Sequence, residues 1–398
     1  MSEIPAIAGG TPVRNSLLSF APPLIEKEEI KEVVDTLKSG WITTGPKTKR
    51  FERMFSEYVS SKYAVALSSC TAGLHLALLA IGVSEGDEII TTPYTFAATS
   101  NVIIHSSAIP VFVDIDEESL NINHNKIEEK ITERTKAIMP VHIGGRPCDM
   151  DKIMEIARRH NLYVIEDAAH AVGTIYKETK IGSIGDLTSF SFHAVKNMTT
   201  AEGGMITTDN EEWARFIRVN SLHGMNKDAW QRKGSWFYEI VSAGYKYNMT
   251  DIQASIGIHQ LEKIERFIEL RKKYASIYTE KLGDIEEIET LSPYEYGRNT
   301  YHLYVIKIKP DRMRITRDKF IRALREENIS TNVHYIPIHL HPYYRERFGY
   351  KKGDYPSAER VYERAISLPI YPAMKEKDVL DVINAIEKIV VYYGGQNV

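Results

Sequence analysis

The alternation of strand-like and helix-like segments between residues 64 and 192 constrains the fold of this chain more than any other feature. Six short runs have the length and the bounding turns of buried strands: Ala64–Leu67, Glu88–Thr92, Val111–Asp114, Ala137–Val141, Tyr163–Glu166 and Leu187–Phe192. Helical patterns fill several of the gaps, most clearly at Met150–His160. This order predicts an α/β fold, in which a mostly parallel sheet is covered by helices on both faces.

The segments before and after this region predict two further parts. Residues 1–24 carry four prolines and a glycine pair without helical periodicity, which predicts an extended N-terminal arm. A long helical stripe begins after Asp251, and later elements are expected at Tyr301–Ile308 (strand), Arg317–Glu326 and Lys377–Val390 (helices). For a chain of 398 residues the size favours two domains. We therefore expect a large domain over residues 25–250 and a smaller C-terminal α+β domain over residues 251–398.

Composition limits the classes of function. The net charge is −3 and both signs are interspersed along the chain, so we expect no nucleic-acid partner and no membrane partner. The N-terminus lacks a basic patch followed by an apolar stretch, and no apolar run reaches about 18 residues, which indicates a cytoplasmic protein. Cys70 and Cys148 lack metal-ligand spacing, and His334, His339 and His341 lack the helical pairing of metal ligands, so we expect no metal.

A lysine at the end of a core strand is the first candidate for chemistry. Phe190 and Phe192 alternate with serines as on a half-buried strand, and Lys196 follows them, ahead of the pair Gly203-Gly204. Ligands of α/β proteins lie at the carboxyl ends of strands. Lysine is the usual side chain for Schiff-base chemistry, which makes Lys196 the candidate nucleophile. A solvated loop lysine is the alternative.

Small hydroxyl-bearing residues near two strand ends suit a phosphate group. Ser69, Cys70 and Thr71 stand between a strand and a helix expected at Ala72–Ile81, so backbone N–H groups and the helix dipole favour an anion there. Ser191 precedes the lysine and adds a further donor. Capping of the helix alone is the alternative explanation for this turn.

An acid and an aromatic residue follow two further strands. Asp167 ends an apolar strand, and a buried aspartate needs a positive partner such as a protonated pyridine nitrogen. Phe96 follows the strand at Glu88–Thr92 and can stack on a flat heteroaromatic ring. The alternatives are an aspartate that caps the next turn and a phenylalanine of the core. Together with Lys196 and the phosphate turn, these are the parts that hold pyridoxal phosphate (PLP).

The sequence resembles the sugar-nucleotide aminotransferases of PLP fold type I, the DegT/DnrJ group, over nearly the whole chain. The resemblance rests on Gly40–Pro46, Ser69–Leu78, Gly86–Ile90, Pro93–Phe96, Glu166–His170, Ser191–Asn197, Glu202–Met205 and Ser367–Pro372. It implies a large domain with a mostly parallel sheet flanked by helices and a smaller C-terminal α+β domain. Cys70 departs from the family, because many members have glycine there; a turn built from backbone N–H groups should tolerate the change.

The resemblance also implies a role for each residue around the cofactor ring. Lys196 would bind the cofactor's aldehyde and later move the proton between the substrate's carbon and the cofactor. Asp167 would pair with the pyridine nitrogen, Phe96 would stack on the ring, and His170 would lie beside the ring's phenolic oxygen.

The phosphate contacts implied by the resemblance involve a second subunit. Ser69, Cys70, Thr71 and Ser191 would bind the cofactor's phosphate from within one chain. Family members act as homodimers with shared active sites, in which an asparagine of the partner subunit reaches the phosphate, and Asn248 matches that asparagine.

The resemblance leads to a specific reaction. Some family members carry histidine in place of Lys196 and dehydrate sugars, so the lysine indicates transamination. The segment Val333–His339, with Tyr343 and Tyr344, resembles members that aminate C4 of a nucleotide-linked sugar. We expect a PLP-dependent aminotransferase that uses glutamate as amino donor and a UDP- or dTDP-linked 4-keto sugar as acceptor, for amino-sugar and surface-polysaccharide biosynthesis. The alternatives are a PLP-dependent dehydratase or lyase on the same fold and a non-catalytic ligand-binding regulator.

Overall fold

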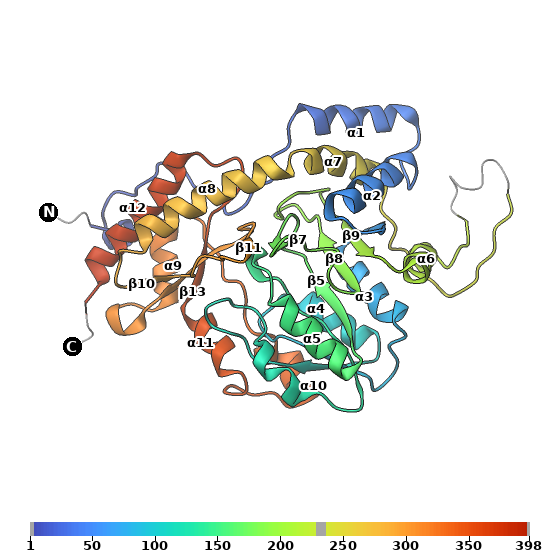
Figure 1. Cartoon of the computed structure of the whole chain (residues 1–398). Helices are drawn as coiled ribbons and strands as arrows, with labels where there is room; N and C mark the ends of the chain where they lie inside the picture. The colour runs from blue at the N-terminus through green and yellow to red at the C-terminus, as the bar shows by residue number, and fades with distance from the viewer. Residues whose placement is uncertain (1–3, 228–235, 396–398) are drawn as a thin grey trace.

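The computed structural model describes residues 4–227 and 236–395 and contains one large and two small sheets (Figure 1). The strands are β1 Tyr63–Leu67, β2 Glu88–Thr91, β3 Ile109–Phe112, β4 Thr135–Ile138, β5 Tyr163–Asp167, β6 Ile175–Tyr176, β7 Thr179–Lys180, β8 Leu187–Ser191, β9 Gly204–Thr208, β10 Ile288–Thr290, β11 Gly297–Arg298, β12 Tyr304–Ile308 and β13 Ala365–Leu368. The α-helices are α1 Lys27–Ser39, α2 Pro46–Val59, α3 Cys70–Ala80, α4 Ala97–His105, α5 Met150–His160, α6 Glu211–Asn220, α7 Asp251–Glu262, α8 Ile264–Leu282, α9 Arg317–Glu326, α10 Pro342–Phe348, α11 Pro356–Arg364 and α12 Glu376–Tyr393.

The seven-stranded sheet has the order β1-β9-β8-β5-β4-β2-β3, and β9 is antiparallel to both of its neighbours while the other pairings are parallel. The six expected strands are all present, so the predicted α/β class is confirmed. The seventh strand, β9, was not predicted. It begins at Gly204, where a Cβ atom would lie 2.5 Å from the backbone nitrogen of Cys70. Only glycine lets β9 start this close to the turn that follows β1.

Helices cover both faces of this sheet, as the uninterrupted apolar strands require. On one face, Phe51 and Phe55 of α2 pack against Phe190 and Phe192, with ring centroids 5.0 Å apart for Phe55 and Phe190. On the other face, α3 is buried on nearly all sides between the sheet, α4 and α6. This burial explains why α3 is apolar around its whole circumference.

Helix α2 was not predicted, although Phe51, Phe55 and Val59 and the apolar residues between them repeat at helical spacing. Pro46 occupies its first turn, where a missing N–H costs nothing. The buried Asp251 then accepts hydrogen bonds from the N–H groups of Gly45, Lys47 and Thr48 at 2.8–3.0 Å. The start of α7 therefore caps the start of α2 and fixes both helices against the sheet.

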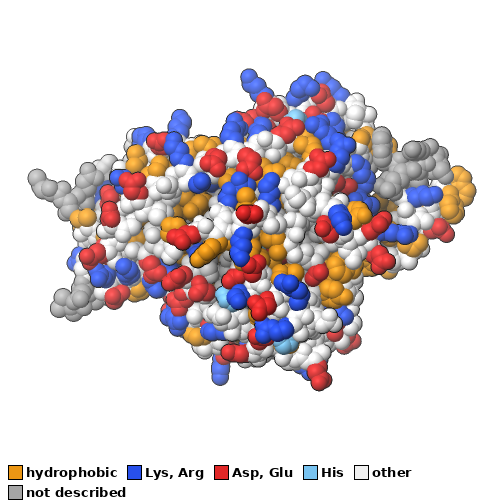
Figure 2. All heavy atoms as spheres, in the orientation of Figure 1, with side chains coloured by type: hydrophobic (Ala, Val, Ile, Leu, Met, Phe, Trp, Pro, Cys, Tyr) orange, Lys and Arg blue, Asp and Glu red, His pale blue; other side chains and the backbone are white. Residues whose placement is uncertain are grey.

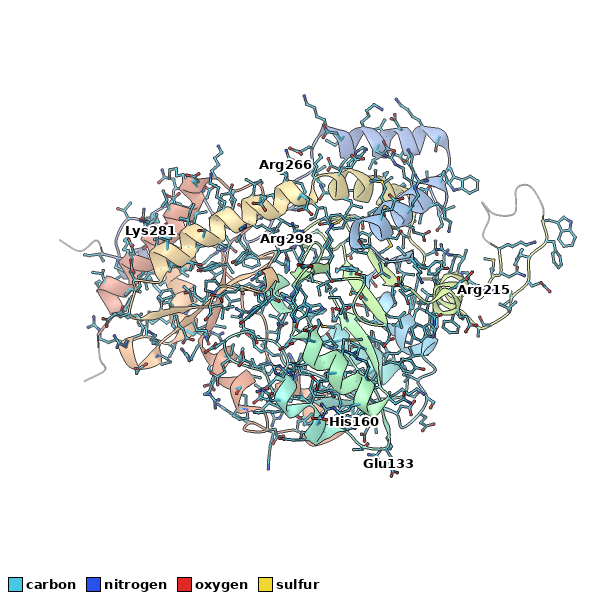
Figure 3. All side chains as sticks on the ribbon, viewed as in Figure 1. Glu133, His160, Arg215, Arg266, Lys281 and Arg298 are labelled. Atoms are coloured by element: carbon cyan, nitrogen blue, oxygen red, sulfur yellow. The ribbon has the colours of Figure 1, made fainter. Side chains whose placement is uncertain are left out.

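The second core surrounds the antiparallel sheet β10-β12-β13, which α8, α9 and α12 cover. Helices α7 and α8 follow one another with a break at Lys263 and run from the large sheet to this small one (Figure 1). Strand β12 begins three residues later than the expected Tyr301, because Tyr301 has a left-handed φ of 48° that interrupts extended pairing. Beneath α8, Arg298 of β11 forms an ion pair with Glu265 at 2.5 Å (Figure 3).

The N-terminal segment is extended apart from one short 3-10 helix, and it is fastened to the small sheet's helices. The buried carboxylate of Glu327 accepts the N–H groups of Ala6 and Val13 at 2.7 and 2.8 Å, and Lys388 pairs with the same carboxylate at 3.1 Å. Residues 1–3 of the predicted arm lie outside the described residues. Leu18 pairs with Ile329 just after α9, which fastens the segment to the same core at a second point.

Charges of both signs are interspersed over the face of the molecule in Figure 2. Within residues 4–227 and 236–395, no helix is long and apolar enough to cross a membrane, and no cluster of three His, Cys, Asp or Glu side chains is arranged to hold a metal.

Candidate active site

A cavity of about 530 Å³ lies at the carboxyl ends of β5 and β8. Eight of the nine predicted site residues line it: Ser69, Cys70, Thr71, Phe96, Asp167, His170, Ser191 and Lys196. They come from four separate strand ends, as parallel strands dictate. The ninth residue, Asn248, lies elsewhere.

Strand β5 directs two consecutive carboxylates to opposite sides. Glu166 faces away from the cavity, where its oxygens bind His142 Nε2, the Thr188 hydroxyl and the N–H of Gly185, each at 2.8 Å. Asp167, the next residue, faces the cavity because side chains alternate along a strand. The pair therefore divides into a structural acid and a site acid.

Asp167 is buried and bound by neutral groups. Its Oδ2 accepts the Thr99 hydroxyl at 2.8 Å and its Oδ1 accepts the N–H of Ala169 at 3.1 Å. Burial raises the pKa of the Asp167 carboxyl, although these two hydrogen bonds and the charge of Lys196 oppose the rise. A buried carboxylate without a cation in contact is costly. The protonated pyridine nitrogen of PLP is a cation that could pair with this carboxylate.

Lys196 lies on the turn that follows β8, where its N–H donates to the carbonyl of His193 at 2.9 Å. The residue is partly buried, and its side chain lines the cavity. Burial of the amine lowers the pKa of Lys196 to about 8, although the charge of Asp167 opposes the shift. A lysine with such a pKa supplies free amine near neutral pH, which both a nucleophile and a base require.

The phosphate turn is a helix N-terminus. Helix α3 begins at Cys70, two residues before the expected Ala72, so Cys70 and Thr71 belong to its first turn. Ser69 is the N-cap, and its hydroxyl accepts the N–H of Ala72 at 3.0 Å. The first N–H groups of a helix have no acceptor within it. The N–H groups of Cys70 and Thr71 therefore suit a phosphate.

Cys70 contributes to this turn through its backbone. Its thiol donates to the carbonyl of Ser189 at 3.4 Å and lies 3.9 Å from the carboxylate of Asp167. Burial and the Asp167 charge raise the pKa of the thiol, so Cys70 stays protonated. The departure from glycine is compatible with the site, because the side chain turns toward the sheet.

Phe96 and His170 lie on the cavity wall around Asp167. Phe96 is 63% exposed at the N-terminus of α4, with its ring centroid 6.0 Å from that of Tyr335. The alternative of a core phenylalanine is therefore wrong. His170 accepts the N–H of Gly144 through Nδ1 at 3.2 Å, so its Nε2 carries the proton and donates to the Tyr335 hydroxyl at 3.1 Å. Burial, followed by the charge of Lys196, lowers the pKa of His170 well below its ordinary value.

Sequence reasoning missed several residues of this site, among them Thr99, His302 and Phe20. Thr99, whose hydroxyl donates to Asp167, also forms a hydrogen bond with the hydroxyl of Thr95 at 2.8 Å. The spacing of four residues between these threonines on a helix was the sequence signal for this pair. His302 and Phe20 also line the cavity. They reach it from the small sheet and the N-terminal segment, and no local pattern marks such long-range contacts.

Asn248 lies in a second cavity, of about 510 Å³, that Arg215 and Arg218 of α6 also line. Its side-chain amide donates to the Thr44 hydroxyl at 2.7 Å, and its buried Oδ1 has no hydrogen-bond partner among the described residues. Within one chain, Asn248 is therefore separate from the residues around Lys196.

A lysine of lowered pKa, a buried acid and an open helix N-terminus in one cavity of this α/β fold define a PLP-dependent enzyme. The model of the DegT/DnrJ/EryC1/StrS aminotransferase family matches residues 23–387, and the chain belongs to this family.

Similar proteins support the same conclusion. The chain is 60% identical to the uncharacterized protein MJ1066 of Methanocaldococcus jannaschii, over 95% of this chain and 99% of that protein. It is 52% identical to the spore coat polysaccharide biosynthesis protein SpsC of Bacillus subtilis, over 95% and 98% of the two chains. The PMP form of the protein named "putative sugar aminotransferase Spr1654" from Streptococcus pneumoniae superposes with a TM-score of 0.89 at 37% identity, covering 94% of this chain and 99% of that one. The protein is a PLP-dependent sugar aminotransferase.

Proposed function

We propose that the protein transfers the amino group of glutamate to the keto group of a 4-keto sugar linked to UDP or dTDP. The observation that carries the proposal is the amine of Lys196, with its pKa of about 8, in the same cavity as the buried Asp167. The similarity to SpsC, which is named for polysaccharide biosynthesis, supports a sugar destined for a polysaccharide.

PLP, when bound, supplies an aldehyde that carries the amino group and a ring that withdraws electrons. The chain's own residues position it. We assign the phosphate to the first turn of α3 with Ser191, the ring face to Phe96, the ring's phenolic oxygen to His170 and the pyridine nitrogen to Asp167, whose carboxylate keeps that nitrogen protonated.

Lys196 moves the proton. Once the donor has displaced it, its amine acts as the base that removes the proton from the donor's α-carbon. As the ammonium, Lys196 would pass this proton to the cofactor, and in the second half-reaction it would take a proton from the cofactor and give it to the sugar carbon that receives nitrogen. A pKa of about 8 suits both steps, because the amine gains and loses a proton readily near neutral pH.

The proposal of a C4 ketone rests on the segment that resembles the C4-aminating members. Val333, His334 and Tyr335 of this segment line the cavity together with Asn332. Burial lowers the pKa of His334 to about 4, so this wall is polar and uncharged. Neutral donors and acceptors suit the hydroxyl groups of a sugar ring.

The proposed enzyme is a homodimer with shared active sites, in which Asn248 reaches the partner's cofactor phosphate. A ribbon of residues 222–227 and 236–246 leaves the body beside Arg215 of α6 (Figures 1 and 3). In this ribbon Trp236 is 82% exposed and Val241 is 61% exposed, and hydrophobic side chains gather at its end (Figure 2). This ribbon is held by the isolated bridges Leu222–Lys246 and Met225–Ile240, and exposed apolar side chains on such a segment favour burial against a partner. We propose that a second copy of the chain covers them.

A panel of UDP- and dTDP-linked 4-keto and 3-keto sugars, assayed with glutamate, tests the reaction. We expect an aminated 4-keto product and parallel initial-rate lines, because the two half-reactions alternate on one cofactor. Consumption of a sugar without an amino donor would instead show a lyase or dehydratase. Sedimentation of the full chain tests the dimer, and a monomer at assay concentration would contradict it.

A further inference from the structure

His302 is a buried polar residue at the cavity for which the reaction scheme has no role. It is 6% exposed and lines the cavity just ahead of β12, with its ring centroid 4.3 Å from that of His170. Its Nδ1 is buried and has no hydrogen-bond partner among the described residues. A buried polar atom without a partner is costly and points to a ligand or a function.

The other histidines beside it are held by the protein. His170 is fixed by Gly144 and Tyr335, and His334 bonds through Nδ1 to the Ser367 hydroxyl at 2.9 Å. No such bond to Nδ1 fixes the tautomer of His302, so its ring can present either a donor or an acceptor to a bound molecule. This is the versatility that recognition of a hydroxyl group requires.

His302 is also kept uncharged. Burial lowers its pKa well below the ordinary value, and the nearby charges of Lys196 and Arg271 oppose protonation further. A neutral imidazole gives no ion pair to a carboxylate such as those of glutamate. It forms neutral hydrogen bonds, which suit the hydroxyl groups of a sugar.

Arg271 of α8 holds the backbone on which His302 stands. The guanidinium is 1% exposed, and it donates to the carbonyls of Tyr301, His302 and Ile370 at 3.3, 3.4 and 2.6 Å. Within residues 4–227 and 236–395 it forms no ion pair with a carboxylate, so its hydrogen bonds serve the backbone. On the other side, the N–H of Leu303 donates to the carbonyl of Gly144 at 3.3 Å.

We propose that His302 binds a hydroxyl group of the sugar acceptor, and that Arg271 is the positioning residue that keeps His302 at the cavity wall. The inference rests on the proposed function, because it concerns the sugar and not the amino donor. Phe20, which stacks on His334 with centroids 5.5 Å apart, closes the neighbouring part of the same wall.

The test separates the two half-reactions of the PLP-loaded enzyme. With glutamate alone, the change in cofactor absorbance reports the half-reaction of the amino donor. The half-reaction of the sugar is followed in the same way, starting from the aminated cofactor and the panel sugar that the wild type converts. His302→Ala should raise the sugar concentration for half-maximal rate about tenfold, the size of one lost hydrogen bond. The donor half should stay within about twofold. His302→Gln should restore most of the sugar affinity, whereas His302→Phe should not.

Calorimetry measures the affinity of the cofactor-free protein for the aminated product without turnover. We expect wild type and His302→Gln to bind it more tightly than His302→Ala and His302→Phe. His75→Gln, at a histidine of α3 that is also 6% exposed and lies outside this cavity, is the control and should change neither half. Arg271→Met should reproduce the sugar-selective defect, with partial rescue in Arg271→Lys.

Four outcomes would overturn the inference. Equal losses in both half-reactions, or a His302→Phe enzyme as good as His302→Gln, would show that His302 only packs. If the wild type converts no sugar of the panel, the proposed function fails and this inference fails with it; if the wild type is active and His302→Ala is unchanged, only this inference fails.

Discussion

Asp167→Asn should have opposite effects on the activity of the loaded enzyme and on the stability of the cofactor-free protein. The amide keeps the shape of the carboxyl, can still accept the N–H of Ala169, and can donate to the Thr99 hydroxyl, which then donates to Thr95. The substitution therefore removes the charge and leaves the packing in place.

The loss of activity follows from the buried pair that Asp167 forms with the pyridine nitrogen. Breaking such a pair costs about 3–5 kcal/mol. Each 1.36 kcal/mol is tenfold in rate. We therefore expect kcat to fall by about two to four powers of ten. The assay is the donor half-reaction in single turnover with saturating glutamate.

The same substitution should increase the free energy of unfolding of the cofactor-free protein. Because the folded-state pKa of Asp167 is raised above its ordinary 3.8, the ionised carboxyl destabilises the fold once the pH exceeds that value. The neutral amide removes this cost, so the variant should gain stability relative to the wild type as pH rises from 4 toward 7. Urea denaturation at several pH values measures the gain.

Asp186→Asn is the matched control. Burial also raises the pKa of Asp186, and this carboxylate accepts the N–H of Val164 at 2.7 Å, but it lies outside the cavity. Its kcat should equal that of the wild type. An Asp167→Asn enzyme within tenfold of wild-type kcat, or a cofactor-free variant less stable than wild type near pH 7, would refute the reasoning.

Three further predictions concern the other parts of the site. Phe96→Ala should raise the dissociation constant of PLP by about two- to tenfold, the contribution of one aromatic contact, as equilibrium dialysis would measure. The thermal unfolding midpoint should not fall, because Phe96 is 63% exposed. Gly204→Ala should weaken PLP binding and destabilise the protein, because the new Cβ would lie 2.5 Å from the nitrogen of Cys70; unchanged dialysis would contradict this. Without cofactor, the free energy of unfolding of the wild type should rise relative to that of Lys196→Met as the pH increases from 8 to 10.5. In this window the folded protein's lysine has lost its proton, whereas the unfolded chain's lysine still keeps it. A difference in unfolding free energy that stays constant across the window would contradict the assignment.

The sequence predicted the large sheet well because its strands are local apolar runs with regular spacing. It also predicted which side chains gather, since Asp167, Lys196 and the turn at Cys70 all follow strands whose carboxyl ends meet. Strand β9 was missed because its identity depends on pairing with β1 and β8. Helix α2 was missed although its apolar residues repeat at helical spacing; only its cap, Asp251, lies about 200 residues away in sequence.

Contacts between distant parts of the chain account for the rest. His302 and Phe20 reach the cavity only through the packing of the small sheet and the N-terminal segment, which no periodicity encodes. The division at residue 250 stays a prediction, and so does the role of Asn248, because that role depends on a second subunit.

Borohydride reduction of the PLP-loaded protein, followed by peptide mass analysis, tests the central claim most directly. The account predicts a cofactor adduct on the peptide that contains Lys196 and none in the Lys196→Ala variant, which should still bind PLP without turnover. An adduct on a different lysine, or unchanged activity in the variant, would contradict it.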